Sequence, residues 1–110
     1  MEITVRAIEA YLKQHYGNWA EEQGLFMKLV EEIGEVAEIL NKRSGRKASD
    51  AVDLQVELGS ELADMIHYIL AIAAINGLDM NEIILEKDRK ASVKYHREVN
   101  LEQFISGIEQ

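Results

Sequence analysis

A chain of 110 residues, 47% hydrophobic and 29% charged, has the size and composition of one folded domain. Its net charge of −8 argues against a general nucleic-acid binder, and its lack of cysteine excludes disulfides, thiol nucleophiles and zinc-thiolate sites. The sequence opens without a signal-peptide pattern, and the apolar stretch over 62–75 is too short to span a membrane, so we expect a cytoplasmic protein with no membrane partner.

Apolar residues recur at helical spacing through the whole sequence, proline is absent, and no segment alternates for long like a β-strand. The pattern predicts a first helix from about Ile3 that stops at Gly17, and a second from about Ala20 to Lys42. The expected buried stripe of the second helix is Phe26, Leu29, Val30, Ile33, Val36, Ala37 and Leu40. A polar, basic loop is expected over 41–50.

Three further helical segments are predicted in the second half of the chain. The third helix is expected to be capped by Ser49 or Asp50 and to end at Gly77, a residue suited to the left-handed stop. Asp79 and Glu82 form a capping-box pattern for a fourth helix that reaches about residue 98. Residues 100–110 carry enough apolar side chains for a short packing helix or a tail that docks on a partner.

The third helix differs from the others because it is apolar nearly all round after Asp64. A helix without a wet face is buried on all sides. Four short helices cannot easily surround one of their own, so we expect a partner subunit to cover it. The prediction is a homodimer or a dimer-of-dimers tetramer.

Two groups of acids stand at helical spacing, Glu31-Glu32-x-x-Glu35 in the second helix and Glu61-x-x-Asp64 in the third. Residues three or four apart share one helix face. Both groups flank their apolar stripes on the same side, so helices packed through these stripes would gather the carboxylates at one edge of the seam. Such a cage repels itself without a cation, and Mg²⁺ or Mn²⁺ prefers oxygen ligands. The pattern favours metal-dependent phosphate chemistry.

Either group alone is more often a solvated helix face with lysine partners. Asp64 is harder to explain in that way, because aspartate is a poor helix-interior residue and this one opens the most apolar segment of the chain. An uncompensated buried carboxylate is costly, so a metal or a cationic partner is expected beside it.

The segments around these acids resemble the MazG-like nucleoside triphosphate pyrophosphohydrolases of the all-α NTP pyrophosphatase superfamily. The resemblance runs through KLVEEIGEVAEIL (28–40), SELADMIHYILAIAAINGLDM (60–80) and EKDRKASVKYHREV (86–99). It implies an all-α, four-helix domain over 1–110, with a short C-terminal helix or tail, completed by oligomerisation. It also implies Mg²⁺-dependent hydrolysis of an NTP or dNTP to the monophosphate and pyrophosphate, in the service of nucleotide-pool housekeeping.

Carried over position by position, the resemblance implies that Glu32, Glu35, Glu61 and Asp64 bind the metal. Glu31 matches an acid that is less consistently bound to metal in the family. One of the three acids in the second helix is expected to accept the proton of the attacking water, which makes Glu31, Glu32 and Glu35 the catalytic candidates.

Substrate contacts are expected from the last long helix and from one aromatic residue. Lys87 matches the family's phosphate-facing lysine, whereas Arg89, Lys94 and Arg97 only approximate the asparagine and arginine-type positions that follow it. Trp19, the only tryptophan, is expected either to stack on a nucleobase or to pack as a hydrophobic staple.

Three other functions fit parts of the pattern. Phosphoribosyl-ATP pyrophosphohydrolase shares the four acids but needs contacts for a second phosphoribosyl group. A di-iron bundle requires Glu-x-x-His from two helices, and this chain offers only Asp64-x-x-His67, with the histidine projecting away from the acids. A non-catalytic helical adaptor would not bind Mg²⁺. The base and sugar preferences stay open.

Overall fold

The computed structural model describes residues 1–17, 21–45 and 53–109, and in these segments the chain forms helices and no strand. The helices are α1 (Val5–Tyr16), α2 (Glu22–Arg43), α3 (Leu54–Ile75), α4 (Met80–Lys94) and α5 (Leu101–Glu109). The all-α prediction is therefore confirmed, and the C-terminal segment is a short helix.

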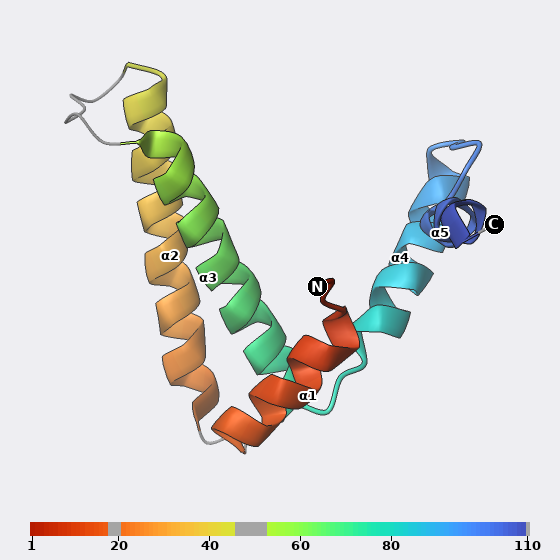
Figure 1. Cartoon of the computed structure of the whole chain (residues 1–110), viewed down its shortest axis with the longest axis horizontal. Coiled ribbons are helices and arrows are strands. Elements are labelled where there is room, and N and C mark those ends of the chain that lie inside the picture. Colours follow the sequence, from red (N-terminus) through yellow and green to blue (C-terminus); the bar gives the residue numbers. More distant parts are fainter. Residues whose placement is uncertain (18–20, 46–52, 110) are drawn as a thin grey trace.

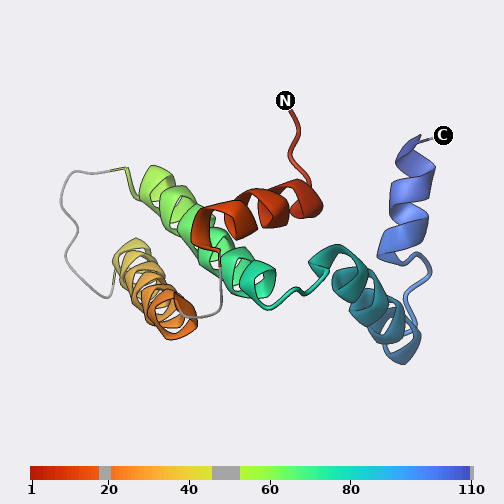
Figure 2. The same ribbon diagram turned by 90° about the horizontal axis from the view of Figure 1, so that it is seen from below.

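The two long helices α2 and α3 run antiparallel side by side, and α1 lies across α3 (Figure 1). The core forms where these three helices meet, around Leu12, Leu25, Leu70, Ala71 and Ala74. The last two helices, α4 and α5, form an arm that projects away from the α2–α3 pair, and α4 packs against α1 and α5 (Figure 2). The chain is consequently open rather than compact.

Side-chain caps begin four of the helices, and at the start of α5 Asn100 accepts a hydrogen bond from the backbone N–H of Gln103. Thr4 accepts a hydrogen bond from the first turn of α1, Asp53 does so for α3, and Asp79 does so for α4. These caps satisfy backbone N–H groups that have no partner inside the helix. The predicted caps of the third helix, Ser49 and Asp50, lie outside the described residues.

Residues with positive φ follow four of the helices: Gly17 after α1, Gly45 after α2, Gly77 after α3 and His96 after α4. Gly77, with φ of 68°, closes α3 as predicted. His96, with φ of 55°, closes α4 in the same way, and the N–H of Arg97 donates to the carbonyl of Ser92 over 2.9 Å. Because His96 takes this conformation, α4 ends at Lys94. The prediction that this helix reaches about residue 98 is therefore wrong. Glycine is the usual signal for such a stop, and residues 95–98 contain none.

The predicted buried stripe of the second helix is partly wrong. Toward α3, the helix presents residues spaced alternately by four and three, namely Leu25, Leu29, Glu32, Val36 and Ile39, which are buried or partly buried. The predicted residues Phe26, Val30, Ile33 and Leu40 are instead 43–54% exposed, and Ala37 is exposed as well. The helix carries two parallel apolar stripes, and periodicity does not tell which one packs within the chain.

The exposed stripe continues onto α3, where Leu62, Ile66 and Ile69 are 41–53% exposed. Each exposed apolar residue directly follows a residue that faces the α2–α3 seam, which places it about 100° further around its helix. Since the helices are antiparallel, both stripes turn to the same side of the pair. We call this surface the apolar face; it comprises Phe26, Val30, Ile33, Leu40, Leu62, Ile66 and Ile69.

The 22 residues of α3 are also long and apolar enough, by length and composition alone, to cross a membrane. The sequence prediction considered only the shorter stretch 62–75. However, α3 carries Glu61 and Asp64 at its middle and packs along both α1 and α2, as the central helix of a folded domain does.

Candidate metal and nucleotide site

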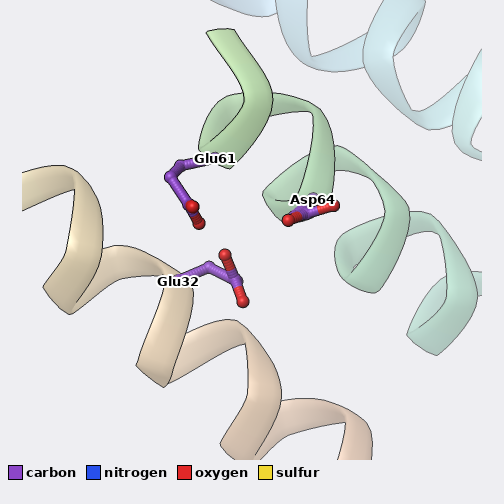
Figure 3. A group of neighbouring side chains, drawn as sticks. All are labelled: Glu32, Glu61 and Asp64. Carbon is purple, nitrogen blue, oxygen red and sulfur yellow. The ribbon is translucent and has the colours of Figure 1, made fainter. Parts of the chain in front are cut away.

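Three acids from two helices meet at the middle of the α2–α3 seam. Glu32 comes from α2, and Glu61 and Asp64 come from α3 (Figure 3). One carboxylate oxygen from each lies within 4.8 Å of the others. Glu32 and Glu61 are partly buried, whereas Asp64 is exposed, so the cluster has a closed inner end and an outer end open to solvent.

Glu35 joins this cluster from the next turn of α2. Hydrogen bonds with Glu32 and then with Glu35, together with burial and the charges of both neighbours, raise the pKa of Glu61 to about 8. Protonation of Glu61 reduces the repulsion among these carboxyls. The structure therefore places three of the four predicted ligands, Glu32, Glu61 and Asp64, in one cluster, and the fourth, Glu35, lies beside Glu61.

Two oxygens of the cluster lack the partners that buried polar atoms normally have. Glu32 Oε2 and Glu61 Oε2 are shielded from solvent and have no hydrogen-bond partner among the described residues. Buried acceptors are rarely left in this state. Octahedral Mg²⁺ holds its oxygens at about 2.1 Å, so that its ligands lie about 3–4 Å from one another. A cluster 4.8 Å across reaches that size with small side-chain rotations, so a hard divalent cation fits these residues.

The position of the acids differs from the sequence prediction in one respect. They were expected at one edge of the seam, beside the apolar stripes of the two helices. The actual seam is shifted by one residue, so Glu32 and Glu61 lie within it. A carboxylate replaces an apolar side chain at the centre of the contact, which explains the shielded oxygens.

Glu31 lies outside the cluster. Its side chain is exposed, and its Oε2 lies 3.6 Å from Lys28 Nζ in an i,i+3 ion pair. Trp19 lies outside the described residues.

The predicted phosphate-binding residues lie on the arm, away from the acids of the same chain (Figure 1). Lys87 is exposed on α4. Lys94 lies 5.3 Å from the ring centroid of Tyr95, and Arg97 pairs with Asp88 over 3.4 Å. Within one chain, these residues and the acid cluster do not form a single site.

An open pocket of about 430 Å³ lies one helical turn from the acids, between the end of α1, the start of α2 and the middle of α3. Its lining residues are Tyr16, Glu21, Gly24, Leu25, Lys28 and Tyr68. Tyr16 is held there by a hydrogen bond of 2.7 Å with Nε2 of His67. Sequence patterns did not reveal this pair, because the two residues meet only through the crossing of α1 over α3.

Comparison with known proteins identifies the family. Residues 20–97 match the profile of the MazG nucleotide pyrophosphohydrolase domain. The chain belongs to the MazG family. This MazG domain is also similar to the crystal structure of iMazG from Vibrio DAT 722, with 26% identity, a TM-score of 0.65, and a match that covers 86% of this chain and 100% of that chain. A search of curated proteins found no match.

The region that matches the MazG domain contains the carboxylate cluster, whose three acids could hold a divalent metal. Among the described residues, the group able to hold a metal consists of carboxylates without histidine. His67, the one histidine that a di-iron site could have used, is bonded to Tyr16 instead. The di-iron interpretation therefore finds no support in the side-chain arrangement.

The raised pKa of Glu61 predicts how the metal-free domain responds to pH. Folded Glu61 keeps its proton up to about pH 8, whereas in the unfolded chain it loses the proton near its ordinary pKa of 4.5. Between these values the folded state binds more protons, so its contribution to stability is lost as the pH rises toward 8. Thermal melts in EDTA should show this fall in wild type and a smaller one in Glu61→Gln. Equal slopes in the two proteins would contradict it.

Proposed function

We propose that this protein hydrolyses nucleoside triphosphates, NTP or dNTP, to the nucleoside monophosphate and pyrophosphate in a Mg²⁺-dependent reaction. The observation that carries the proposal is the cluster of Glu32, Glu61 and Asp64 with its two shielded, unpartnered oxygens, inside a MazG domain. Removal of non-standard or excess nucleotides from the cytoplasmic pool is the role that we infer for it.

In this proposal Glu32, Glu35, Glu61 and Asp64 hold Mg²⁺, with Mn²⁺ as an alternative. The bound cation would neutralise charge on the phosphates and acidify a water molecule. Glu35 is the best placed of the three catalytic candidates to accept the proton of the attacking water, because it contacts the cluster and is open to solvent. Glu32 is partly buried in the seam, and Glu31 forms an ion pair with Lys28, so both are less well placed to accept this proton.

The phosphates need cationic contacts that the acid cluster does not supply. We propose Lys87 for this role, with Lys94 and Arg97 adding positive charge, and Trp19 as an aromatic contact for the substrate. Because α4 points away from the acids of its own chain, Lys87 would reach the phosphates in the site of a partner subunit (Figure 1).

Two features support a homodimer, or a tetramer built from two dimers. The apolar face extends over both long helices, and the described residues leave it exposed. Patches of this kind mark interaction surfaces. The radius of gyration is 17.2 Å, against about 13 Å expected for a compact domain of this length. An extended arm beside an exposed apolar face is consistent with a dimer in which each chain packs around the other.

The experiment is a pyrophosphate-release assay over a panel of canonical and modified NTPs and dNTPs with Mg²⁺, beside Glu35→Gln and Asp64→Asn. Wild type should release pyrophosphate from at least one nucleotide, and both variants should lose this activity. Folded protein that binds Mg²⁺ but turns over no nucleotide in the panel would overturn the proposal and direct attention to phosphoribosyl-ATP. Absence of both turnover and Mg²⁺ binding would favour the adaptor.

A further inference from the structure

The pocket beside the acid cluster has the composition of a subsite for a flat heterocycle. Tyr16 and Tyr68 supply aromatic surface, and Gly24 and Leu25 add an apolar, sterically open section. Aromatic and apolar walls with a few polar groups are typical of small-molecule sites, and 430 Å³ lies in their usual size range. Polar groups reach the pocket from Glu21, Lys28 and the two phenols.

The pocket lies at a fixed offset from the acids. Lys28 precedes Glu32 by one turn of α2, and Tyr68 follows Asp64 by one turn of α3. Since the helices are antiparallel, both steps lead in the same direction, and each covers about 6 Å along the helix axis. A sugar can span such a gap between a phosphate at the acids and a base in the pocket.

Tyr16 lines this pocket and is held in place by contacts with His67. Its hydroxyl lies 2.7 Å from Nε2 of His67, and the two rings meet edge to face with their centroids 5.7 Å apart. The phenol is the more acidic partner, so its O–H donates to the ring nitrogen and its oxygen keeps free lone pairs. Burial, with smaller contributions from Tyr68, Glu21 and Tyr11, raises the pKa of Tyr16, so the hydroxyl stays protonated.

We propose that this pocket receives the nucleobase of the substrate and that Tyr16, positioned by His67, selects bases that carry an exocyclic amino group. The inference rests on the proposed function. Two of the residues that line the pocket carry acceptor oxygens, Tyr16 in its hydroxyl and Glu21 in its carboxylate. An exocyclic amino group offers two N–H donors to these acceptors. The edge of thymine offers a single N–H between two carbonyl oxygens, and the acceptor oxygens repel those carbonyls. Tyr16 precedes the region that matches the family profile, so the match does not assign this role.

The test is calorimetric binding of dCMP, dAMP, dGMP and dTMP with Mg²⁺, with 2-deoxyribose 5-phosphate as the base-free probe. Wild type should bind the three amino-bearing monophosphates at least about tenfold more tightly than the sugar phosphate, and dTMP less tightly than these. Tyr16→Phe should lose about fivefold to tenfold of that preference, as expected for one hydrogen bond, with unchanged affinity for the sugar phosphate. Tyr11→Phe is the matched control, because Tyr11 lies on the same helix outside the pocket.

His67 is tested as a positioning residue through a rescue. His67→Leu removes the acceptor of the Tyr16 hydroxyl and should reproduce the selectivity loss of Tyr16→Phe, while His67→Gln, which keeps an acceptor oxygen, should restore most of the selectivity. If a variant does not fold, the ring-proton shifts of Tyr16 in wild type on addition of dCMP give the same answer.

The outcomes separate the inference from the proposed function. Equal binding of monophosphates and sugar phosphate, or equal selectivity in Tyr16→Phe and Tyr11→Phe, would overturn the inference even if triphosphates are hydrolysed. Unperturbed Tyr16 resonances in the presence of bound dCMP would do the same. Absence of binding by every monophosphate, together with no pyrophosphate release from triphosphates, would overturn both.

Discussion

Replacing Glu61 by glutamine is expected to lower Mg²⁺-dependent pyrophosphate release at least about 100-fold, because a metal ligand that supports the transition state contributes several kcal/mol. The same change should leave the metal-free protein as stable as wild type, or more so. A glutamine amide can donate to the carboxylates of Glu32 and Glu35, which in wild type depend on a proton held by Glu61. Activity assays and thermal melts in EDTA measure the two effects.

The matched control is Glu57→Gln, one turn earlier on α3 and outside the acid cluster. It should retain wild-type turnover and Mg²⁺ affinity. A Glu61→Gln protein that is inactive and also less stable without metal would indicate that Glu61 serves mainly to hold the seam together. A fully active one would remove Glu61 from the metal site.

Mixing two inactive proteins, Glu61→Gln and Lys87→Ala, should restore activity if the acids and the lysine of one site come from different chains. In a hybrid dimer, one site combines intact acids from the second chain with an intact lysine from the first. Random exchange between two-fold symmetric dimers gives about a quarter of the wild-type activity. The measurement is pyrophosphate release after the proteins are mixed under conditions that allow subunit exchange.

The control mixture is Glu61→Gln with Asp64→Asn, since both changes fall in the same acid cluster and no hybrid site escapes damage. It should stay inactive. If the first mixture also stays inactive although exchange is demonstrated, Lys87 either acts within its own chain after a movement of α4 or does not contact the substrate.

The fold class and the acid cluster were predictable because both depend on local spacing. Helical periodicity without proline predicted the helices, and Gly77 and Asp79 marked the junction of α3 and α4. The i,i+3 spacing of Glu61 and Asp64 placed both on one side of α3, so a single antiparallel contact with α2 sufficed to bring them to Glu32. The MazG resemblance gave the same acids.

The remaining features depend on tertiary contacts that spacing does not encode. Glu32 occupies the seam because the stripe of Leu25 and Ile39, rather than that of Phe26 and Leu40, faces α3. Both apolar stripes of α2 have the same helical period, so periodicity alone does not determine which of them packs against α3. The early end of α4 depends on the left-handed conformation of His96. A histidine at this position does not by itself predict that conformation.

Hydrolysis to monophosphate and pyrophosphate is best tested by phosphorus NMR of a reaction mixture with Mg²⁺ and the best nucleotide of the panel. The spectrum identifies which phosphoanhydride bond is broken. We expect equal amounts of nucleoside monophosphate and pyrophosphate from wild type, and neither product from Glu61→Gln or when EDTA removes the metal. Formation of nucleoside diphosphate and orthophosphate, or release of pyrophosphate that persists in Glu61→Gln, would contradict it.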